Sequence, residues 1–216
     1  MEKFRGQELE RRQIKDSGKK VKQLSEPRIN PLEGEWHKSL TQEYNSFNML
    51  YDGKIINILR TVANHPKLMK SWYPFFIHMV GGSRLPRRDM EIIILRITWL
   101  CQSEYAWSRH AASAIEIGVS EEEIKRITIG SEAEGWSDFE RTLLRAVDEL
   151  YIDAFISEET WKALSEKYNT QKLMALIFLV GEYNLVSMFL NSVGVQLDES
   201  RKPKTMKTEI QKGFPE

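Results

Sequence analysis

Apolar residues recur at intervals of three and four along most of the chain, the spacing that gathers them on one face of an α-helix. Two short amphipathic helices are predicted over residues 41–50 and 53–65. Pro66 then interrupts the pattern, and the next helix, predicted over residues 66–82, contains Pro74, which should bend it. The first part of the chain is therefore expected to form short helices separated by prolines.

The stretch "PRRDMEIIILRITWLC", residues 86–101, is apolar on nearly all sides. Pro86 stands where a helix would begin, because the fixed φ of proline suits the first helical turn. A buried strand is the alternative for "EIIILRI", given its isoleucines. The periodic run is longer than a typical strand, so it predicts a central, buried helix.

Five more helices are predicted after residue 102. Two of them begin with a capping box, a serine followed three residues later by a glutamate: Ser120 with Glu123, and Ser137 with Glu140. The first and the last of the five end at a glycine, a natural left-handed stop. The predicted ranges are 103–118, 121–130, 138–154, 158–169 and 170–194. No hairpin or βαβ pattern is recognised, so the predicted fold class is all-α, in a single domain.

The apolar stretch over residues 172–194 is long enough to cross a bilayer. Glu182, Asn184 and Asn191 interrupt it, and a charged group at the middle of a bilayer is costly. A helix buried in the protein core is therefore the better interpretation, and no membrane contact is expected.

The composition agrees with one folded domain. The chain has 216 residues, of which 41% are hydrophobic, enough to form a core. The formal net charge is zero, so no overall field attracts nucleic acid or an anionic membrane. A single cysteine makes no internal disulfide, which indicates a reducing, cytoplasmic compartment.

Charged, polar segments flank the predicted domain. Residues 1–27 are charged from the second position and lack the apolar run of a signal peptide. We expect them to form a flexible arm, with a basic interaction tail as the less common alternative. Residues 199–216 have the same character, which leaves residues 28–198 as the helical domain.

The stretch "CQSEYAWSRH", residues 101–110, holds the only cysteine, an acid, two aromatic residues and a histidine. On a helix that starts at residue 103, Ser103, Ala106 and His110 share one face. Ser103 is also a candidate N-cap, and the free N–H groups of that helix end favour an anion such as a substrate carboxylate. Upstream, Glu91 lies inside the apolar helix, where it must be paired, protonated or exposed to a cavity.

These residues carry a resemblance to a known family. The segment "LPRRDMEIIILRITWLCQSEYAWSRHAASAIEIGVSEEEI" resembles the carboxymuconolactone decarboxylase family, which shares the AhpD-like fold of alkylhydroperoxidases. The segments "GWSDFERTLLRAVDEL" and "VGEYNLVSMFLNSVGVQLDE" resemble its longer members, so the likeness covers roughly residues 40–198. The resemblance implies an all-helical homo-oligomer (a dimer, trimer or hexamer) with its site near subunit contacts.

The redox branch of this family uses a glutamate, a Cys-x-x-Cys pair and a histidine. In register, these positions fall on Glu91, Ser103, Ala106 and His110, so both thiols are missing. Cys101 lies two residues early and is counted as neither. Peroxidase chemistry with two thiols is not expected, because serine forms no sulfenic acid and alanine cannot resolve one.

Glu91 and His110 are the first candidates for catalysis. A buried carboxylate and an imidazole can both be tuned toward neutral pH and act as general acid and base. The alternative is a hydrogen-bonded pair that only joins two helices. The family's usual arginine before the glutamate is replaced by Met90, which leaves open how the charge of Glu91 is balanced, with Arg87 and Arg88 nearby.

The other candidate residues have plain structural alternatives. Glu104 is a third catalytic candidate, or a first-turn acid that stabilises the helix end. Tyr183 and Asn191 lie eight positions apart on one face and would line a pocket or a subunit contact. Aromatic residues at helical spacing, and a histidine beside them, also commonly fill a core. The candidates for substrate binding are Ser103, Tyr105, Trp107 and His78.

Three functional hypotheses result. The first is a cofactor-independent enzyme that transfers protons on a small cyclic or aromatic carboxylated substrate, by decarboxylation or related lyase or isomerase chemistry. The second is a redox protein that uses Cys101 alone. The third is a non-catalytic oligomeric ligand-binding protein, in which Glu91 and His110 satisfy each other with no solvent-connected cavity beside them. No metal site is expected, because no metal-ligand spacing is recognised.

Overall fold

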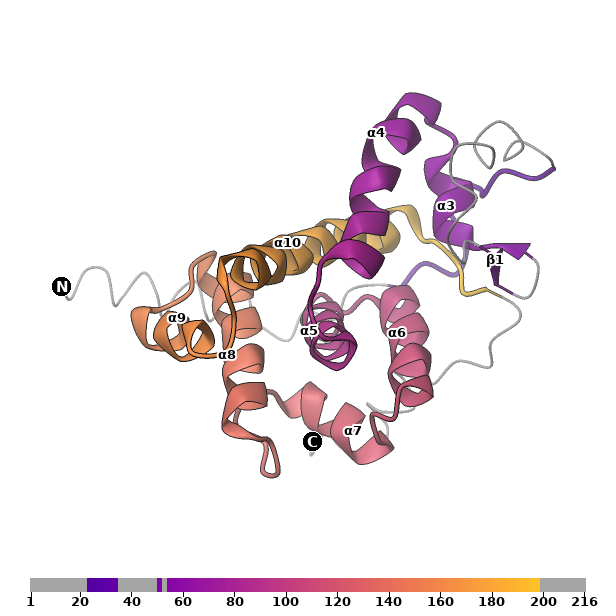
Figure 1. Ribbon diagram of the computed structural model, residues 1–216. Coiled ribbons are helices and arrows are strands. Elements are labelled where there is room, and N and C mark those ends of the chain that lie inside the picture. The colour runs from indigo at the N-terminus through magenta and orange to yellow at the C-terminus, as the bar shows by residue number, and fades with distance from the viewer. Residues whose placement is uncertain (1–22, 35–49, 52–53, 199–216) are drawn as a thin grey trace, which may run out of the picture.

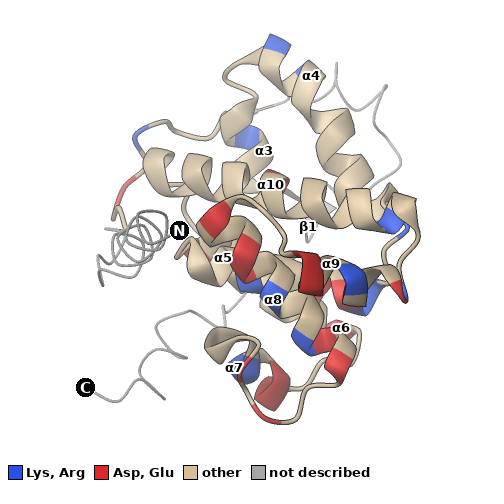
Figure 2. Cartoon of the chain, turned by 90° about the vertical axis from the view of Figure 1, so that its left-hand side faces the viewer, with Lys and Arg blue, Asp and Glu red and all other residues tan. Residues whose placement is uncertain are grey.

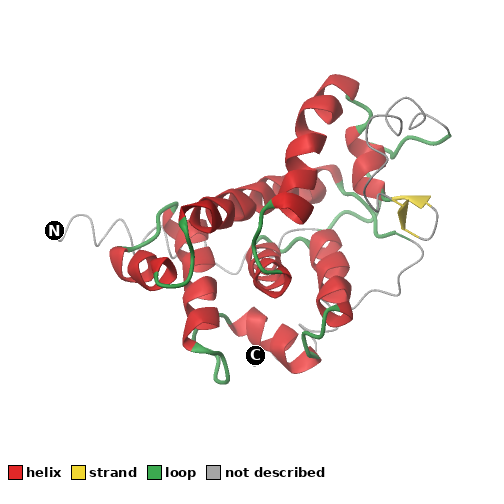
Figure 3. Cartoon of the chain, in the orientation of Figure 1, coloured by secondary structure: helices red, strands yellow, loops and turns green. Residues whose placement is uncertain are grey.

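The computed structural model describes residues 23–34, 50–51 and 54–198 of the chain. Helices make up most of this part, as Figure 3 shows. A first pair, α3 (Asn57–Val62) and α4 (Pro66–Ile77), is continued by a short π-helix, η1 (His78–Gly82). The later helices are α5 (Arg87–Leu100), α6 (Glu104–Glu116), α7 (Glu121–Ile129), α8 (Asp138–Asp153), α9 (Glu158–Ser165) and α10 (Thr170–Val193). The predicted all-α class is confirmed.

Helix α5 is the centre of the fold, as predicted from its apolar character. It packs against α6, α7, α8 and α10, and the other helices lie around it in Figure 1. Ile92, Ile93, Ile94 and Ile97 have no exposed surface. A helix surrounded in this way buries side chains all round, which is why its sequence lacks a polar face.

Helix α6 contributes side chains to two separate clusters of the core. Trp107 belongs to the cluster formed with α5 and α7, whereas Tyr105 belongs to the cluster formed with α3, α4 and α10. A tight turn with Gln102 at φ 51° joins α5 to α6 and holds the start of α6 beside the end of α5. This position gives one face of α6 access to both α5 and α10.

The ends of several helices follow the sequence signals. Both capping boxes form, because Ser120 and Ser137 accept from the backbone three residues on while the glutamates bond back. Ser157 caps α9 and Gly194 ends α10 in the left-handed region at φ 74°. These contacts span at most four residues, so the sequence alone predicts them.

The region before α4 differs from the prediction. The helix predicted over residues 53–65 is limited to α3, because β1 (Leu50–Tyr51) and β2 (Lys54–Ile55) pair antiparallel. The expectation of no hairpin is therefore wrong at this point. Most of the helix predicted over residues 41–50 lies outside the described residues.

The segment before residue 35 is held against the C-terminal end of α10. The backbone N–H of Arg28 donates to Val193 O at 2.8 Å, and Gln196 Nε2 donates to Leu24 O at 3.1 Å. Leu24, which lies within the predicted N-terminal arm of residues 1–27, is thus held against the helical domain. Residues 1–22 of that arm, and the predicted tail 199–216, lie outside the described residues.

Helix α10 is long and apolar enough to cross a membrane by length and composition, with a mean hydropathy of 1.9. The core helix of a soluble protein meets the same criterion, and half of the most apolar 18-residue stretch of α10 is buried inside the protein. Its buried side carries Leu176, Leu179 and Tyr183 against α5 and α8. The interpretation of α10 as a core helix agrees with this packing.

Candidate functional site

A chain of hydrogen bonds links α5, α6 and α10. His110 on α6 places Nδ1 2.8 Å from Glu91 Oε2 on α5, and Nε2 2.8 Å from the hydroxyl of Tyr183 on α10. Glu91 and Tyr183 are only 3% and 2% exposed, and His110 is partly buried. The histidine therefore connects a buried carboxylate to a buried phenol, and we call these three residues the relay.

The protons of the relay have one arrangement when the imidazole is neutral. An ionised Glu91 can only accept, so Nδ1 of His110 carries the hydrogen. Nε2 is then an acceptor, and the Tyr183 hydroxyl donates to it. The His110 and Tyr183 rings meet edge to face, with 5.0 Å between their centroids.

Burial decides the charge of Tyr183. Loss of contact with water raises the pKa of its hydroxyl well above the ordinary value, the carboxylates of Glu91 and Glu182 raise it further, and Arg109 opposes them. The phenol therefore keeps its proton over the neutral range. The hydroxyl of Tyr183 is therefore a hydrogen-bond donor to His110 over this range.

The carboxylate of Glu91 is paired with His110 and not with the nearby arginines. Arg88 points to the first turns of α7 and α8, where it bonds Glu123 and lies 2.6 Å from Glu140 Oε1. Glu123 and Glu140 are the glutamates of the two capping boxes. Glu91, which has Met90 and not an arginine before it, is thus paired with His110, 19 residues away in the sequence.

A polar strip continues from the relay along α10. Tyr183 contacts His110, and Asn191, two turns later, donates to the backbone oxygen of Cys101 at 2.9 Å. These contacts run antiparallel, and Ser187 lies midway between them on α10. Ser103 and Ser187 are both fully buried, and neither hydroxyl has a hydrogen-bond partner among the described residues.

Ser103 occupies the N-cap position of α6, as predicted. Its side chain makes no capping hydrogen bond, unlike the serines that begin α7, α8 and α9. The first turn of α6 thus keeps N–H groups that no side chain satisfies, beside a buried hydroxyl. This is the kind of helix end that binds an anionic oxygen.

Trp107 lies in the core. Its side chain is fully buried, and its ring packs against Trp99 at 5.1 Å between centroids. The indole Nε1 has no hydrogen-bond partner among the described residues, although a buried indole usually finds one. The packing fits the core interpretation of this residue, and its unpaired donor leaves a ligand contact as a prediction.

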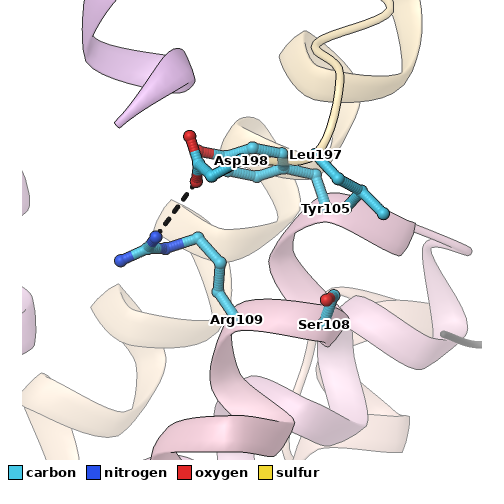
Figure 4. A pocket seen from close by; sticks show the side chains of 5 residues that line it. All are labelled: Tyr105, Ser108, Arg109, Leu197 and Asp198. Carbon is cyan, nitrogen blue, oxygen red and sulfur yellow. Dashed lines mark hydrogen bonds and ion pairs between the residues drawn. The ribbon is translucent and has the colours of Figure 1, made fainter. Parts of the chain in front are cut away.

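Tyr105 faces away from the relay. Its hydroxyl donates to Asp198 Oδ2 at 2.8 Å and accepts from the backbone N–H of Ile58 at 3.3 Å. Asp198 also pairs with Arg109 at 3.1 Å, and these residues line a shallow hollow with Ser108 and Leu197 (Figure 4). Burial raises the pKa of Tyr105, so it stays a neutral donor that ties the segment after α10 to α6.

Among the described residues, no hydrogen bond links Glu104 or His78 to the relay. Glu104 is in the first turn of α6 and accepts from Gln23. His78 is exposed at the start of η1, with its ring over Gly82, where a Cβ would come within 2.8 Å of Nδ1. The interpretation of His78 as a core histidine is wrong, because the π-helix turns it outward.

One further carboxylate and the cysteine thiol also have hydrogen-bond partners. Glu182 is buried and accepts from Trp72 Nε1 at 2.6 Å, and the Cys101 thiol donates to Asn184 at 3.3 Å. Sequence reasoning gave Glu182 no role; its signal is the run of three polar residues, 182–184, inside an apolar helix. Within the described residues, no three His, Cys, Asp or Glu side chains are grouped to hold a metal ion.

Replacing Glu182 by glutamine should stabilise the protein increasingly as pH rises. Burial raises the pKa of Glu182 above its ordinary value of 4.5, and the Trp72 hydrogen bond only partly opposes this. The folded state therefore binds the proton more tightly, so the charged form weakens folding above the raised pKa and not below 4.5. Urea unfolding of wild type and Glu182→Gln between pH 4.5 and 8.5 tests this. The difference between their free energies of unfolding should widen with pH, by about 1.4 kcal/mol per unit of pKa shift. A difference that stays constant with pH contradicts the prediction.

The fold and the relay define a class: an all-α protein of AhpD-like architecture with a buried glutamate–histidine pair between adjacent helices. The model of the carboxymuconolactone decarboxylase family matches residues 66–149, which span α4 to most of α8 and include Glu91 and His110. This match, together with neighbours of the AhpD-like fold, supports assignment of the chain to the carboxymuconolactone decarboxylase family. A comparison with curated proteins gave no match.

Solved structures with this fold include peroxidase-related proteins and a debrominase. An uncharacterized peroxidase-related protein from Silicibacter sp. TM1040 has a TM-score of 0.65 at 16% identity, covering 84% of this chain and 94% of that one. The AhpD core of a peroxidase-related protein from Ralstonia eutropha JMP134 gives 0.67 at 14%, covering 81% and 95%. The debrominase Bmp8 in complex with 2,3,4-tribromopyrrole gives 0.68 at 13%, covering 87% and 98%. At these identities the likeness establishes the fold.

Proposed function

We propose that this chain is a cofactor-independent enzyme that transfers protons on a small cyclic or aromatic carboxylated substrate. The observation that carries the proposal is the position of His110, bonded at one nitrogen to Glu91 and at the other to Tyr183. A pair that only joined two helices would not need the third residue. The bound tribromopyrrole of the debrominase with this fold is in keeping with a small ring as substrate.

In the decarboxylation version, the bond between carbon and the carboxylate breaks and CO₂ leaves. The electron pair moves to a neighbouring carbonyl or lactone oxygen, which becomes an enolate. Tyr183 gives its proton to the carbon while protonated His110 returns one from Nε2 to the phenol oxygen, and Glu91 stabilises the imidazolium beforehand. Water then restores the proton on His110, so each CO₂ released consumes one proton. Isomerisation would use the same groups without loss of CO₂.

The developing oxyanion is proposed to lie between Ser103 and Ser187. A bound oxygen would give both buried hydroxyls the partner they lack, and the uncapped first turn of α6 would add backbone N–H groups. Ser187 lies on the strip one helical turn from Tyr183, so the acceptor oxygen and the proton donor would be neighbours. Glu104, Tyr105, Trp107 and His78 stay as weaker predictions for the substrate's other contacts.

The second candidate is the non-catalytic ligand-binding protein. One specific observation favours it: Glu91 and His110 satisfy each other, and the hollow in Figure 4 is lined by other residues. The redox alternative through Cys101 alone has no such observation in its favour. The two remaining hypotheses differ in whether changes in the relay that keep its packing abolish turnover.

A substrate screen with packing-neutral variants tests the proposal. Carboxylated lactones and β-keto acids are offered to the wild type, and CO₂ release is measured. Tyr183→Phe and Glu91→Gln should lower turnover by about 10²–10⁴-fold, because Tyr183 donates the proton and Glu91 stabilises the imidazolium that replaces it. Ser187→Ala should lower it by about 10²-fold, the usual effect of losing one oxyanion donor.

Cys101→Ser and Ser108→Ala are the matched controls, since they alter a nearby thiol and a buried hydroxyl off the strip. Both should keep wild-type turnover. Loss of activity in Cys101→Ser with a normal Tyr183→Phe would point instead to thiol chemistry. A wild type that binds a screened compound without converting it would support the ligand-binding protein.

A further inference from the structure

Helix α6 carries two donors for a carboxylate outside the relay. Tyr105 and Arg109 are four positions apart, so they lie on the same side of the helix. The Tyr105 hydroxyl donates to Asp198 Oδ2 at 2.8 Å, and Arg109 Nη1 donates to the same oxygen at 3.1 Å. A guanidinium and a hydroxyl that converge on one oxygen have the chemistry of a carboxylate-binding site.

The carboxylate that these donors hold belongs to the chain itself. Asp198 is in the segment after α10, residues 195–198, which is neither helix nor strand. The charged residues between positions 170 and 198 are Lys172, Glu182 and Asp198, and Figure 2 shows α10 as a nearly uncoloured ribbon. A mostly apolar part of the chain therefore ends in one carboxylate that pairs with Arg109.

The contacts of Asp198 leave room for exchange. Its other oxygen, Oδ1, accepts from the backbone N–H of Asn57 at 2.8 Å, and Asn57 Nδ2 donates to Gln196 O at 3.1 Å. The side chains of Arg109 and Asp198 are 24% and 13% exposed, so both members of the ion pair keep contact with solvent. A ligand carboxylate in the place of Asp198 would meet the same donors and the same charge, so the exchange mainly requires release of segment 195–198.

The surroundings of the ion pair favour an organic ligand. The Tyr105 and Leu197 side chains line the hollow of Figure 4 together with the ion pair. An apolar wall beside a few fixed polar groups is typical of sites for small organic molecules. An inorganic anion has no apolar part to place against Leu197.

We propose that Tyr105 and Arg109 form a binding site for a small organic carboxylate with an apolar body, and that Asp198 occupies this site in the absence of the ligand. The ligand displaces Asp198 and releases segment 195–198 from α6. Asp198 is then an internal competitor, which lowers the apparent affinity by the fraction of time that the site is open. This inference does not depend on the proposed reaction.

Benzoate binding to the full-length chain, followed by ligand-observed NMR, tests the site. Benzamide has the same shape without the charge and should bind at least about 10-fold more weakly than benzoate. Arg109→Gln should weaken benzoate binding by about 10-fold or more, because a hydrogen bond to a charged group is lost. Arg145→Gln, at a surface arginine on α8, should leave benzoate binding unchanged.

Asp198→Asn should have the opposite effect and strengthen benzoate binding on the order of 10-fold, because the amide has no charge to hold the guanidinium. A misfolded variant would not show this gain. Unchanged benzoate affinity in Arg109→Gln, or no binding by either the wild type or Asp198→Asn, would overturn the proposal. Competition by sulfate at the same concentration as benzoate would overturn the restriction to organic carboxylates.

Hydrogen exchange at Asn57 shows whether benzoate displaces Asp198. The Asn57 N–H loses its acceptor when Asp198 leaves, so saturating benzoate should speed its exchange several-fold or more, while exchange in α8 stays unchanged. Bound benzoate with unchanged exchange at Asn57 would place the ligand elsewhere and contradict the displacement. Tyr183→Phe should bind benzoate like the wild type, so a failure of the proposed reaction and a failure of this site are told apart.

Discussion

Replacing His110 by leucine is expected to destabilise the fold by about 3–5 kcal/mol, the range for breaking a buried ion pair from one side. The change strands the buried carboxylate of Glu91 and removes the acceptor of the Tyr183 hydroxyl, both now 2.8 Å from the imidazole. Burying unpaired polar groups is the largest part of this effect. Urea unfolding of the purified variant at neutral pH measures it.

The double variant Glu91→Leu/His110→Leu is the control for this prediction. Since it removes both members of the pair, no carboxylate is left stranded, and its loss should be smaller than the sum of the two single losses. A coupling of at least 1 kcal/mol is expected between contacting residues. Additive losses would mean that the pair contributes no mutual stabilisation.

A stable pair is compatible with catalysis. Glu91→Gln keeps an oxygen that accepts from His110, so it should fold while losing turnover. Leucine at either position changes stability and activity together. Comparing the two kinds of substitution separates what the relay does for the fold from what it does for a reaction.

The second large effect is expected for Arg96→Met, with a loss of about 3–5 kcal/mol. The guanidinium is buried and lies 2.6 Å from Asp148 Oδ1, and it donates to the backbone oxygens of Ile127 and Thr128 at 2.9 Å. These bonds join α5 to α8 and satisfy the C-terminal end of α7. Gly130 is required beside it, because a Cβ there would come within 2.5 Å of Arg96 Nη2.

The loss in Arg96→Met should shrink as the pH falls. Burial already raises the pKa of Asp148 above its ordinary value of 3.8, and Arg96 is the main group that opposes this. Without the arginine the pKa of Asp148 rises further. The ionised Asp148 carboxylate therefore destabilises the variant fully only above this new pKa, and its effect disappears as the pH falls toward 3.8. Urea unfolding at pH 5 and pH 8 measures the difference.

Arg145→Met provides the comparison for Arg96→Met. Its ion pair with Glu159, at 3.2 Å, is formed at the surface, where that carboxylate's side chain is 85% exposed. Exposed pairs contribute little, so a loss below about 1 kcal/mol is expected. Equal losses in the two arginine variants would contradict the role given to burial.

Features that depend on near neighbours in the chain could be predicted from the residue pattern. Helix starts at Ser120, Ser137 and Ser157 follow from contacts within four residues, and the central position of α5 follows from an apolar run with no polar face. The need for a partner at Glu91 also follows, since a carboxylate inside that run cannot stay alone. The resemblance in the same segment supplied His110 as that partner.

Contacts between residues far apart in the chain became known only from the packing of the helices. Tyr183 lies 73 residues from His110 in the chain, and its place in the relay depends on how α10 crosses α6. The same packing buries the hydroxyls of Ser103 and Ser187, directs the Tyr105 hydroxyl to Asp198 and leaves Met174 and Phe178 in water. Residue patterns show which face of a helix is apolar, but contacts between helices depend on their crossing and rotation, which are set by side chains far apart in the sequence.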